Sequence, residues 1–317
     1  MALRNKTEPR PLMLSKRANV FYLEHARVIQ QDERVVYLTD DGGEFEQIFN
    51  IPERNTAFLL LGKGTSITDA AMRRLAASQV LVGFCGSGGS PLSGAVDPVF
   101  LVPQSEYRPT HYMQEWSRLW FQEEKRLELA RYFLKERVRL TAEAWRDNIS
   151  LSQLGISVSE ALRQQVDAEL SRAEGTQELL LVEARWARRL YADLAGGHGF
   201  PFKREEGKRA SSSLADICNG FLDHGNYIAY GYASVVLCGL GISFAMPVLH
   251  GKTRRGALVF DLADIIKDAL VMPLAFECAQ KGASPQEFRL SLIDLCQEKE
   301  VLDFLFDFME KACKKVQ

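Results

Sequence analysis

The stretch Leu249–Leu270 constrains this chain most strongly, because it combines an apolar helix with acidic side chains. Residues 257–270 are apolar almost all round, which is the pattern of a helix buried in a protein interior. Asp261, Asp264 and Asp268 interrupt this pattern, and their i, i+3, i+7 spacing places them on one face of the helix. Carboxylates on a buried face are unfavourable unless cations compensate them.

Two kinds of compensation are open for this acidic stripe. Lys267 can pair with one acid and Arg254 or Arg255 with another, which would make the stripe a polar seam or a salt-bridge network. Alternatively, acids together with His250, on a turn ahead of the helix, are the ligand types of a hard divalent metal ion. His250 taken alone is more typical of a hydrogen-bonded core residue than of a ligand.

A second helix, predicted around Leu179–Leu194, also carries a carboxylate where an apolar side chain is expected. Glu183 shares one helical face with Leu179, Trp186, Leu190 and Leu194. A buried pair between Glu183 and an arginine would satisfy it, and so would a metal ion. Two helices that each carry a misplaced acid favour a shared site more than either helix alone.

Two glycine-containing motifs do not support nucleotide binding. The Gly251-Lys252-Thr253 text lacks the glycine that a phosphate-binding loop needs five residues earlier, because Met246 stands there. The glycine-rich segment 86–94 is not followed by a helical pattern, so we interpret it as a turn rather than a dinucleotide loop.

The N-terminal third of the chain has the alternation of β-strands. Residues 17–62 form β-rich runs separated by polar turns such as Asp40–Gly43, and residues 79–85 form an apolar strand. A short helix is predicted over Thr65–Ser78, with Thr65 or Ser66 as its N-cap.

Helical periodicity begins near Arg108 and continues to the end of the chain. We therefore predict an α+β protein, with a small N-terminal β-rich domain over residues 1–105 and a larger all-α domain over residues 106–317. The predicted helical stretches are one long helix through Met113–Val138, then Leu151–Ala173, Glu178–Leu194, Ser213–Gly239 and Pro285–Lys314. Pro273 is expected to bend or end the acid-bearing helix.

Composition narrows the class of protein. The six cysteines show no CxxC spacing, which argues against a zinc knuckle or a disulfide framework and for a reducing cytoplasm. The N-terminal residues have no apolar core typical of a signal peptide, and no run of 18 apolar residues predicts a membrane span. The net charge of −2 does not indicate nucleic-acid binding, so any DNA contact must come from local basic clusters.

Two local basic clusters are candidates for contact with DNA. One adjoins His250 and the other lies in a loop rich in glycine and serine, where a solvated surface is the simpler interpretation. The candidate residues are Lys252, Arg254 and Arg255 in the first cluster, and Lys203, Arg204, Lys208 and Arg209 in the second.

The order Glu183, His250, Asp261-x-x-Asp264, in the texts VEARWARRLY and LHGKTRRGALVFDLADIIKD, resembles the CRISPR adaptation integrase. That family is the metal-dependent endonuclease of the CRISPR-associated proteins that inserts new spacers. SKRANVFYLEHARV and LVGFCGSGG are similar to its N-terminal domain. QSEYRPTHYMQEW and FLDHGNYIAYGYA are most similar to the version in type I-F systems.

The resemblance implies an antiviral-defence enzyme that joins a short duplex prespacer to the CRISPR repeat by phosphodiester transesterification. It implies Mg²⁺ or Mn²⁺ held by Glu183, His250 and Asp264, with Asp261 completing the site or orienting a water. Lys267 and Arg254 would neutralise the scissile phosphate, and the segment that contains Tyr230 would line the site and contact DNA.

The implied partners are double-stranded DNA, a second copy of the chain through the β-domain, and a second CRISPR adaptation protein fused to a helicase-nuclease. No membrane partner is expected. Two other functions remain open: a non-catalytic DNA-binding scaffold, which would tolerate loss of the acids, and a generic metallophosphohydrolase, which would not need the β-domain.

Overall fold

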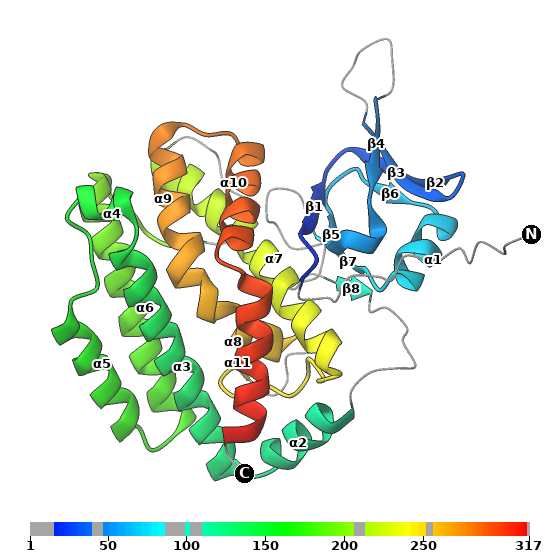
Figure 1. The fold of residues 1–317 in the computed structure, drawn as a ribbon. Helices are drawn as coiled ribbons and strands as arrows, with labels where there is room; N and C mark the ends of the chain where they lie inside the picture. Colours follow the sequence, from blue (N-terminus) through cyan, green and yellow to red (C-terminus); the bar gives the residue numbers. More distant parts are fainter. Residues whose placement is uncertain are drawn as a thin grey trace, which may run out of the picture.

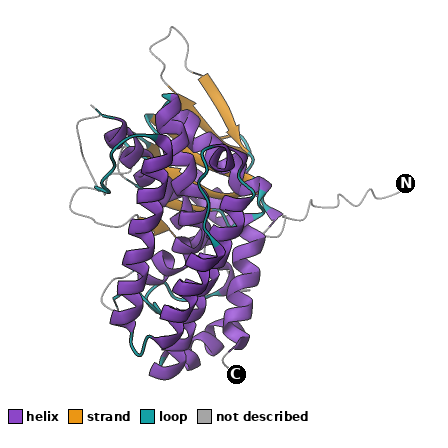
Figure 2. Cartoon of the chain, turned by 90° about the vertical axis from the view of Figure 1, so that its left-hand side faces the viewer, coloured by secondary structure: helices purple, strands orange, loops and turns teal. Residues whose placement is uncertain are grey.

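The computed structural model describes residues 16–39, 47–85, 99–101, 110–205, 213–251 and 256–315. It has a β-rich N-terminal region followed by a mostly helical region, which confirms the predicted α+β fold (Figure 1). In the side view of Figure 2 the strands gather toward the upper end of the helical layer. No helix among the described residues is long and apolar enough to cross a membrane.

The β-rich region consists of two sheets. The first has the order β1-β5-β7-β8, in which β1, β5 and β7 are parallel and β8 is antiparallel to β7. Its strands are β1 (Asn19–Leu23), β5 (Thr56–Leu61), β7 (Leu81–Phe84) and β8 (Val99–Leu101). All six residues of β5 are buried, as expected for a parallel strand that is covered on both faces.

The second sheet has the order β4-β3-β2-β6. Its strands are β2 (Ala26–Gln31), β3 (Arg34–Thr39), β4 (Gln47–Ile51) and the short β6 (Ser66–Ile67). β3 and β4 pair antiparallel, in agreement with the predicted hairpin. The predicted turns over 40–43 and 86–94 lie outside the described residues. A 3₁₀ turn, Glu53–Asn55, leads into β5.

The first helix begins later than predicted. Ser66 and Ile67 pair with β2 as the edge strand β6, so neither Thr65 nor Ser66 is the N-cap. Thr68 caps α1 (Asp69–Ala77) instead, by accepting a hydrogen bond from the N–H of Ala71. The prediction failed because a hydroxyl residue at the end of a strand and one at a helix N-cap look alike in the sequence.

Three predicted helical stretches are each broken into two helices, and the last of them, Pro285–Lys314, is α10 (Pro285–Glu298) and α11 (Val301–Lys315). The long stretch through Met113–Val138 is α2 (Thr110–Trp120) and α3 (Glu123–Arg146). The stretch over Leu151–Ala173 is α4 (Ile149–Gln153) and α5 (Glu160–Arg172), separated at Gly155, whose φ is +69°. The helix around Glu183 is confirmed as α6 (Thr176–His198).

The central helix is α7 (Leu214–Leu240), which is buried along most of its length and packs against α8, α9 and β5. A side-chain carbon built at Gly231 would lie 2.3 Å from the Phe58 ring, so only glycine lets α7 approach β5 this closely. Other helices that contact α7 include α10 and α11.

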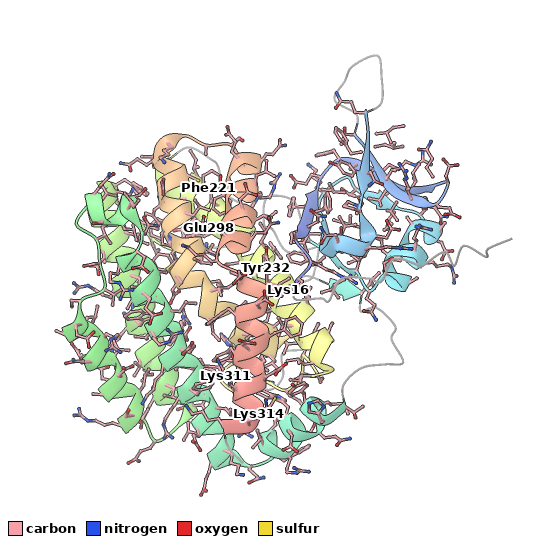
Figure 3. All side chains as sticks on the ribbon, viewed as in Figure 1. Lys16, Phe221, Tyr232, Glu298, Lys311 and Lys314 are labelled. Carbon is pink, nitrogen blue, oxygen red and sulfur yellow. The ribbon has the colours of Figure 1, made fainter. Side chains whose placement is uncertain are left out.

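The N-terminal residues of the described chain also cross to the helical region. Figure 3 labels Lys16 beside α11, and its Nζ atom lies 2.7 Å from the Asp303 carboxylate. All six cysteines are buried and free.

The acid-bearing helix continues past Pro273 but changes its geometry before it. α8 (Ala257–Ile266) widens into a π turn over Lys267–Val271 and then continues as α9 (Met272–Lys281). In the π turn the N–H of Met272 donates to the carbonyl of Lys267, a wider spacing than in an α-helix. Pro273 therefore marks a widened turn of the helix and does not end it.

A candidate metal and nuclease centre

Three helices and one turn bring the predicted site residues together. Figure 1 shows α3 and α6 side by side, and α3 also packs along α8 and the π turn. Every residue of α8 is buried, and the three acids of the stripe expose only 4% (Asp261), 7% (Asp264) and 0% (Asp268) of their surface. Carboxylates this deeply buried need specific partners, and the structure gives each acid a different set.

Asp261 organises the turn that carries His250. Its Oδ2 accepts hydrogen bonds from the N–H groups of Val248 at 2.6 Å and Leu249 at 3.1 Å. Its Oδ1 accepts the N–H of His250 at 3.0 Å and lies 2.6 Å from Nδ1 of the same residue. Asp261 is thus occupied by the turn, and it orients the imidazole with Nε2 toward Asp264, at 3.9 Å from Oδ2.

Burial disfavours a charged His250, but the surrounding acids outweigh that effect. Desolvation lowers the pKa of the imidazole, whereas the hydrogen bond with Asp261 and the charges of Asp264, Asp261 and Glu183 raise it, and the net result is a raised pKa. A carboxylate on Nδ1 that leaves Nε2 free is the usual arrangement of a metal-binding histidine.

Asp264 is held between two cations. Lys267 donates to its Oδ1 at 2.6 Å, and Nη1 of Arg137 lies 3.6 Å from its Oδ2. Desolvation raises the pKa of the carboxyl, but the charges of Lys267, Arg137 and His250 lower it by more. The resulting pKa is about 2. The predicted pairing of Lys267 with one acid of the stripe is confirmed.

Glu183 and Asp268 share Arg137 of α3. Nη1 of Arg137 donates to Glu183 at 2.7 Å, while its Nε and Nη2 donate to the two oxygens of Asp268 at 2.6 and 3.0 Å. The Trp186 indole N–H donates to Asp268 as well, at 2.9 Å. The buried glutamate–arginine pair that the sequence left open therefore exists, and it lies inside the acid cluster.

The donor set fits a divalent cation. Among the described residues, the four carboxylates pair with two permanent cations, Arg137 and Lys267, and with the imidazole of His250, so acids outnumber basic groups in the cluster. His250 supplies a nitrogen that Asp261 has already oriented. A small cavity of about 10 Å³, about the space that one water molecule needs, borders Arg137, Asp261 and Asp264. Within the described ranges no group of three or more His, Cys, Asp or Glu side chains is already arranged to hold a metal ion.

Arg137, Trp145 and Trp186 are members of the site that were not predicted from the sequence. Arg137 lies on the apolar face of α3, between the buried residues Leu134 and Thr141. That is the same signal, a charge on an apolar face, that identified Glu183. A basic residue on an apolar helix face therefore indicates a site residue in the same way as an acidic one.

The proposed DNA-binding residues differ in their surroundings. Tyr230 of α7 adjoins the centre: its ring packs edge-on against Phe260, and Nζ of Lys267 lies 5.3 Å from the ring centroid. Lys203 is exposed, whereas Arg204 is half-buried and paired with Asp223 at 2.6 Å. The other predicted basic residues, Lys208, Arg209, Lys252, Arg254 and Arg255, lie outside the described residues.

The fold and the site define a class: an α+β protein whose helical region holds a buried cluster of acids with a histidine. Within that class, this chain belongs to the family described as CRISPR associated protein Cas1, whose model matches residues 20–292. The CRISPR-associated endonuclease Cas1 of Pseudomonas aeruginosa (strain UCBPP-PA14) is 46% identical over 319 residues, covering 98% of this chain and 97% of that relative.

Two solved structures share the fold. TtCas1 in complex with DNA has a TM-score of 0.64 at 21% identity, and it covers 93% of this chain and 91% of its own. A casposase bound to integration product has a TM-score of 0.72 at 15% identity, with the same coverage. At such low identities these likenesses establish the fold alone.

Proposed function

We propose that this protein is a divalent-metal-dependent DNA endonuclease and integrase. It inserts short duplex spacers into a CRISPR array by phosphodiester transesterification. The observation that carries the proposal is the convergence of Glu183, Asp264 and Nε2 of His250 on one buried, negatively charged centre. The family, the named endonuclease relative and the shared fold of DNA-bound TtCas1 and of the casposase support it.

The residues of the centre would have different roles in catalysis. Glu183, His250 and Asp264 would hold the cation, and Asp261 would keep Nδ1 of His250 engaged so that Nε2 is the coordinating atom. When bound there, Mg²⁺ or Mn²⁺ supplies a Lewis acid for the phosphoryl oxygen and lowers the pKa of the attacking hydroxyl.

Basic side chains and Tyr230 would then act on the DNA substrate. Lys267, which lies beside Tyr230, would offset the charge that develops on the scissile phosphate once Asp264 binds the metal. Tyr230, Lys203 and the basic residues near His250 would hold the DNA backbone. Arg204 is a weaker candidate because Asp223 already compensates its charge.

Replacement of the centre's acids tests the proposal directly. Asp264→Ala is expected to abolish Mn²⁺-dependent cleavage of duplex DNA and strand transfer into a repeat-containing plasmid, and Glu183→Ala and His250→Ala should behave likewise. The matched control is Asp294→Ala, which removes an exposed acid of α10. Full activity of Asp264→Ala would contradict the proposal, as would metal-independent activity of the wild-type protein.

The same assay separates the other two functions. A non-catalytic scaffold would bind DNA equally well with and without Asp264 and would cleave nothing. A generic metallophosphohydrolase would cleave a small phosphodiester such as bis(p-nitrophenyl) phosphate but would not join two DNA ends. Strand transfer by the wild-type protein excludes both.

We further propose that the chain works as a type I-F adaptation protein in the cytoplasm. Its six free, buried cysteines are compatible with a reducing compartment. Its partner would be the second adaptation protein, fused to a helicase-nuclease. Co-purification of the two proteins expressed together, with and without the helicase-nuclease portion, tests this partner.

We propose a homodimer formed through the β-rich domain, residues 1–105, with the helical domain over 106–317. β4 is an edge strand of its sheet and exposes Ile48 (56%) and Phe49 (41%), and an apolar edge strand of this kind favours pairing with another chain. Sedimentation of Ile48→Lys should show a shift toward monomer, whereas Leu181→Lys, an exposed apolar site on α6, should not. A monomeric wild-type protein at micromolar concentration would contradict the proposal.

A further inference from the structure

Asp268 is the acid of the stripe to which the proposed function assigns no role, although it is fully buried. Its two carboxylate oxygens accept three hydrogen bonds, two from Arg137 and one from the Trp186 indole. These donors occupy the carboxylate oxygens, so the oxygens are not available to a metal ion. The contacts of Asp268 are therefore those of a residue that positions its neighbours, and they are not those of a metal ligand.

The main chain of Asp268 is held as firmly as its side chain. Its carbonyl oxygen accepts the indole N–H of Trp145 at 2.9 Å. Donors from α3 and α6 thus fix both ends of this residue within the π turn. A π turn within an α-helix is uncommon and frequently marks a functional position.

The guanidinium of Arg137 connects Asp268 to two proposed metal ligands, Glu183 and Asp264. Because the group is planar and rigid, holding Nε and Nη2 on Asp268 also determines where Nη1 lies. Nη1 lies 2.7 Å from Glu183 and 3.6 Å from Asp264, between two of the proposed metal ligands. Nη1 is therefore aimed at the gap between these carboxylates.

We propose that Asp268 is a positioning residue that acts through Arg137. It holds the guanidinium so that Nη1 sets the separation of Glu183 and Asp264, and its charge offsets that of Arg137, so that the arginine does not compete with the divalent cation. The part that concerns metal affinity rests on the proposed function of the centre. The part that concerns the coupling of Asp268 to Glu183 does not.

Calorimetric titration with Mn²⁺ tests the first part. Asp268→Asn keeps the shape of the side chain but removes its charge, and it should weaken Mn²⁺ binding by about 10- to 100-fold, the usual effect of losing a residue that orients a ligand. In an Arg137→Gln background the same replacement should change affinity by less than about threefold, because the residue it acts through is gone. Equal losses in both backgrounds would overturn the proposal, since a direct ligand would produce them.

Arg137→Lys covers the case in which Arg137→Gln does not fold. Lysine keeps the positive charge but cannot reach Asp268 and Glu183 at once through a rigid fork. It should therefore weaken Mn²⁺ binding about as much as Asp268→Asn does. Wild-type affinity in Arg137→Lys would show that the geometry of the guanidinium is irrelevant, and the proposal would be wrong.

Urea unfolding in EDTA tests the second part without metal. In a double-mutant cycle, Glu183→Gln and Asp268→Asn should have non-additive effects on unfolding, although the two carboxylates bind different nitrogens of Arg137. The non-additivity should disappear when Arg137 is replaced by lysine. If the wild-type protein bound no Mn²⁺, the proposed function would fail, but this cycle would still test the coupling of Asp268 to Glu183. Additive effects in the cycle would overturn the proposed role of Asp268.

Discussion

Trp145 donates its indole N–H to the carbonyl oxygen of Asp268 across 2.9 Å, although the two residues are 123 positions apart. In an α-helix this carbonyl would accept the N–H of Met272, and in a π turn that of residue 273. The N–H of Met272 is engaged by Lys267, and Pro273 has no N–H. The indole therefore supplies the donor that the helix lacks at this buried position.

Trp145→Phe should lower the free energy of unfolding, because it leaves a buried carbonyl without a donor. The expected cost of that lost bond is about 1–3 kcal/mol, and the smaller ring adds a packing loss. Urea unfolding measures the sum. Adding Pro273→Ala restores an N–H at residue 273 and should recover part of the stability in the Trp145→Phe background. If Pro273→Ala is equally destabilising with and without Trp145, this explanation of the contact is wrong.

Asp261→Asn should disrupt the turn that carries His250. An amide has one acceptor oxygen, so its NH₂ group would face N–H donors that now bind the carboxylate, such as those of Val248 and Leu249. We expect a lower melting temperature and about 10- to 100-fold weaker Mn²⁺ binding, because the imidazole is no longer oriented. Asp193→Asn, which alters an ion pair with Arg189 on the surface of α6, is the control. Unchanged Mn²⁺ affinity in Asp261→Asn would contradict the proposed role of Asp261.

The lowered pKa of Asp264 predicts a specific dependence of stability on acid. Its pKa is about 2 in the folded protein and 3.8 at its ordinary value, so ionised Asp264 stabilises the fold above pH 3.8. That contribution, about 2 kcal/mol from the shift, should be lost as the pH falls from about 4 to about 2.

Comparison of the wild-type protein with Asp264→Asn, by denaturant unfolding in EDTA, measures this contribution. The difference in unfolding free energy should be constant above about pH 5 and should shrink toward pH 2. A difference that instead grew as the pH fell would mean that the carboxyl is protonated more easily in the folded state, contrary to its contacts with Lys267 and Arg137.

Binding of DNA by a chain with a net charge of −2 should be short-ranged and strongly dependent on salt. Each phosphate neutralised contributes about −0.9 to the slope of log K against log salt. Replacing Arg254 and Arg255 together with alanine should weaken binding to all duplex sequences alike and flatten that slope by about two units.

Fluorescence anisotropy over a series of salt concentrations measures this slope. The control is the pair Arg34→Ala and Arg73→Ala, which removes two exposed arginines of the β-rich region. If the Arg254/Arg255 variant altered sequence preference and kept its salt slope, these arginines would read bases, and the proposed backbone contact would be wrong.

The sequence by itself determined the fold class and the main members of the centre. Alternating apolar residues predict the strands through Leu61, and the 3.6-residue period predicts the helices after Arg108, because local burial patterns follow the geometry of each element. Glu183 and Asp264 were identifiable because a charge on an apolar face has an energetic cost that demands a partner. His250 was indicated by its place on the turn ahead of the acid-bearing helix and by the family resemblance.

The tertiary structure alone decided what each charged group does. The sequence places Asp261, Asp264 and Asp268 on one stripe as equivalent acids, yet one holds the His250 turn, one meets Lys267, and one is enclosed by Arg137 and Trp186. The last of these roles depends on Arg137 and Trp186, which come from helices far away in the chain. Periodicity reports which face of a helix is buried, but the partner across that face is set only when α3, α6 and α8 pack together.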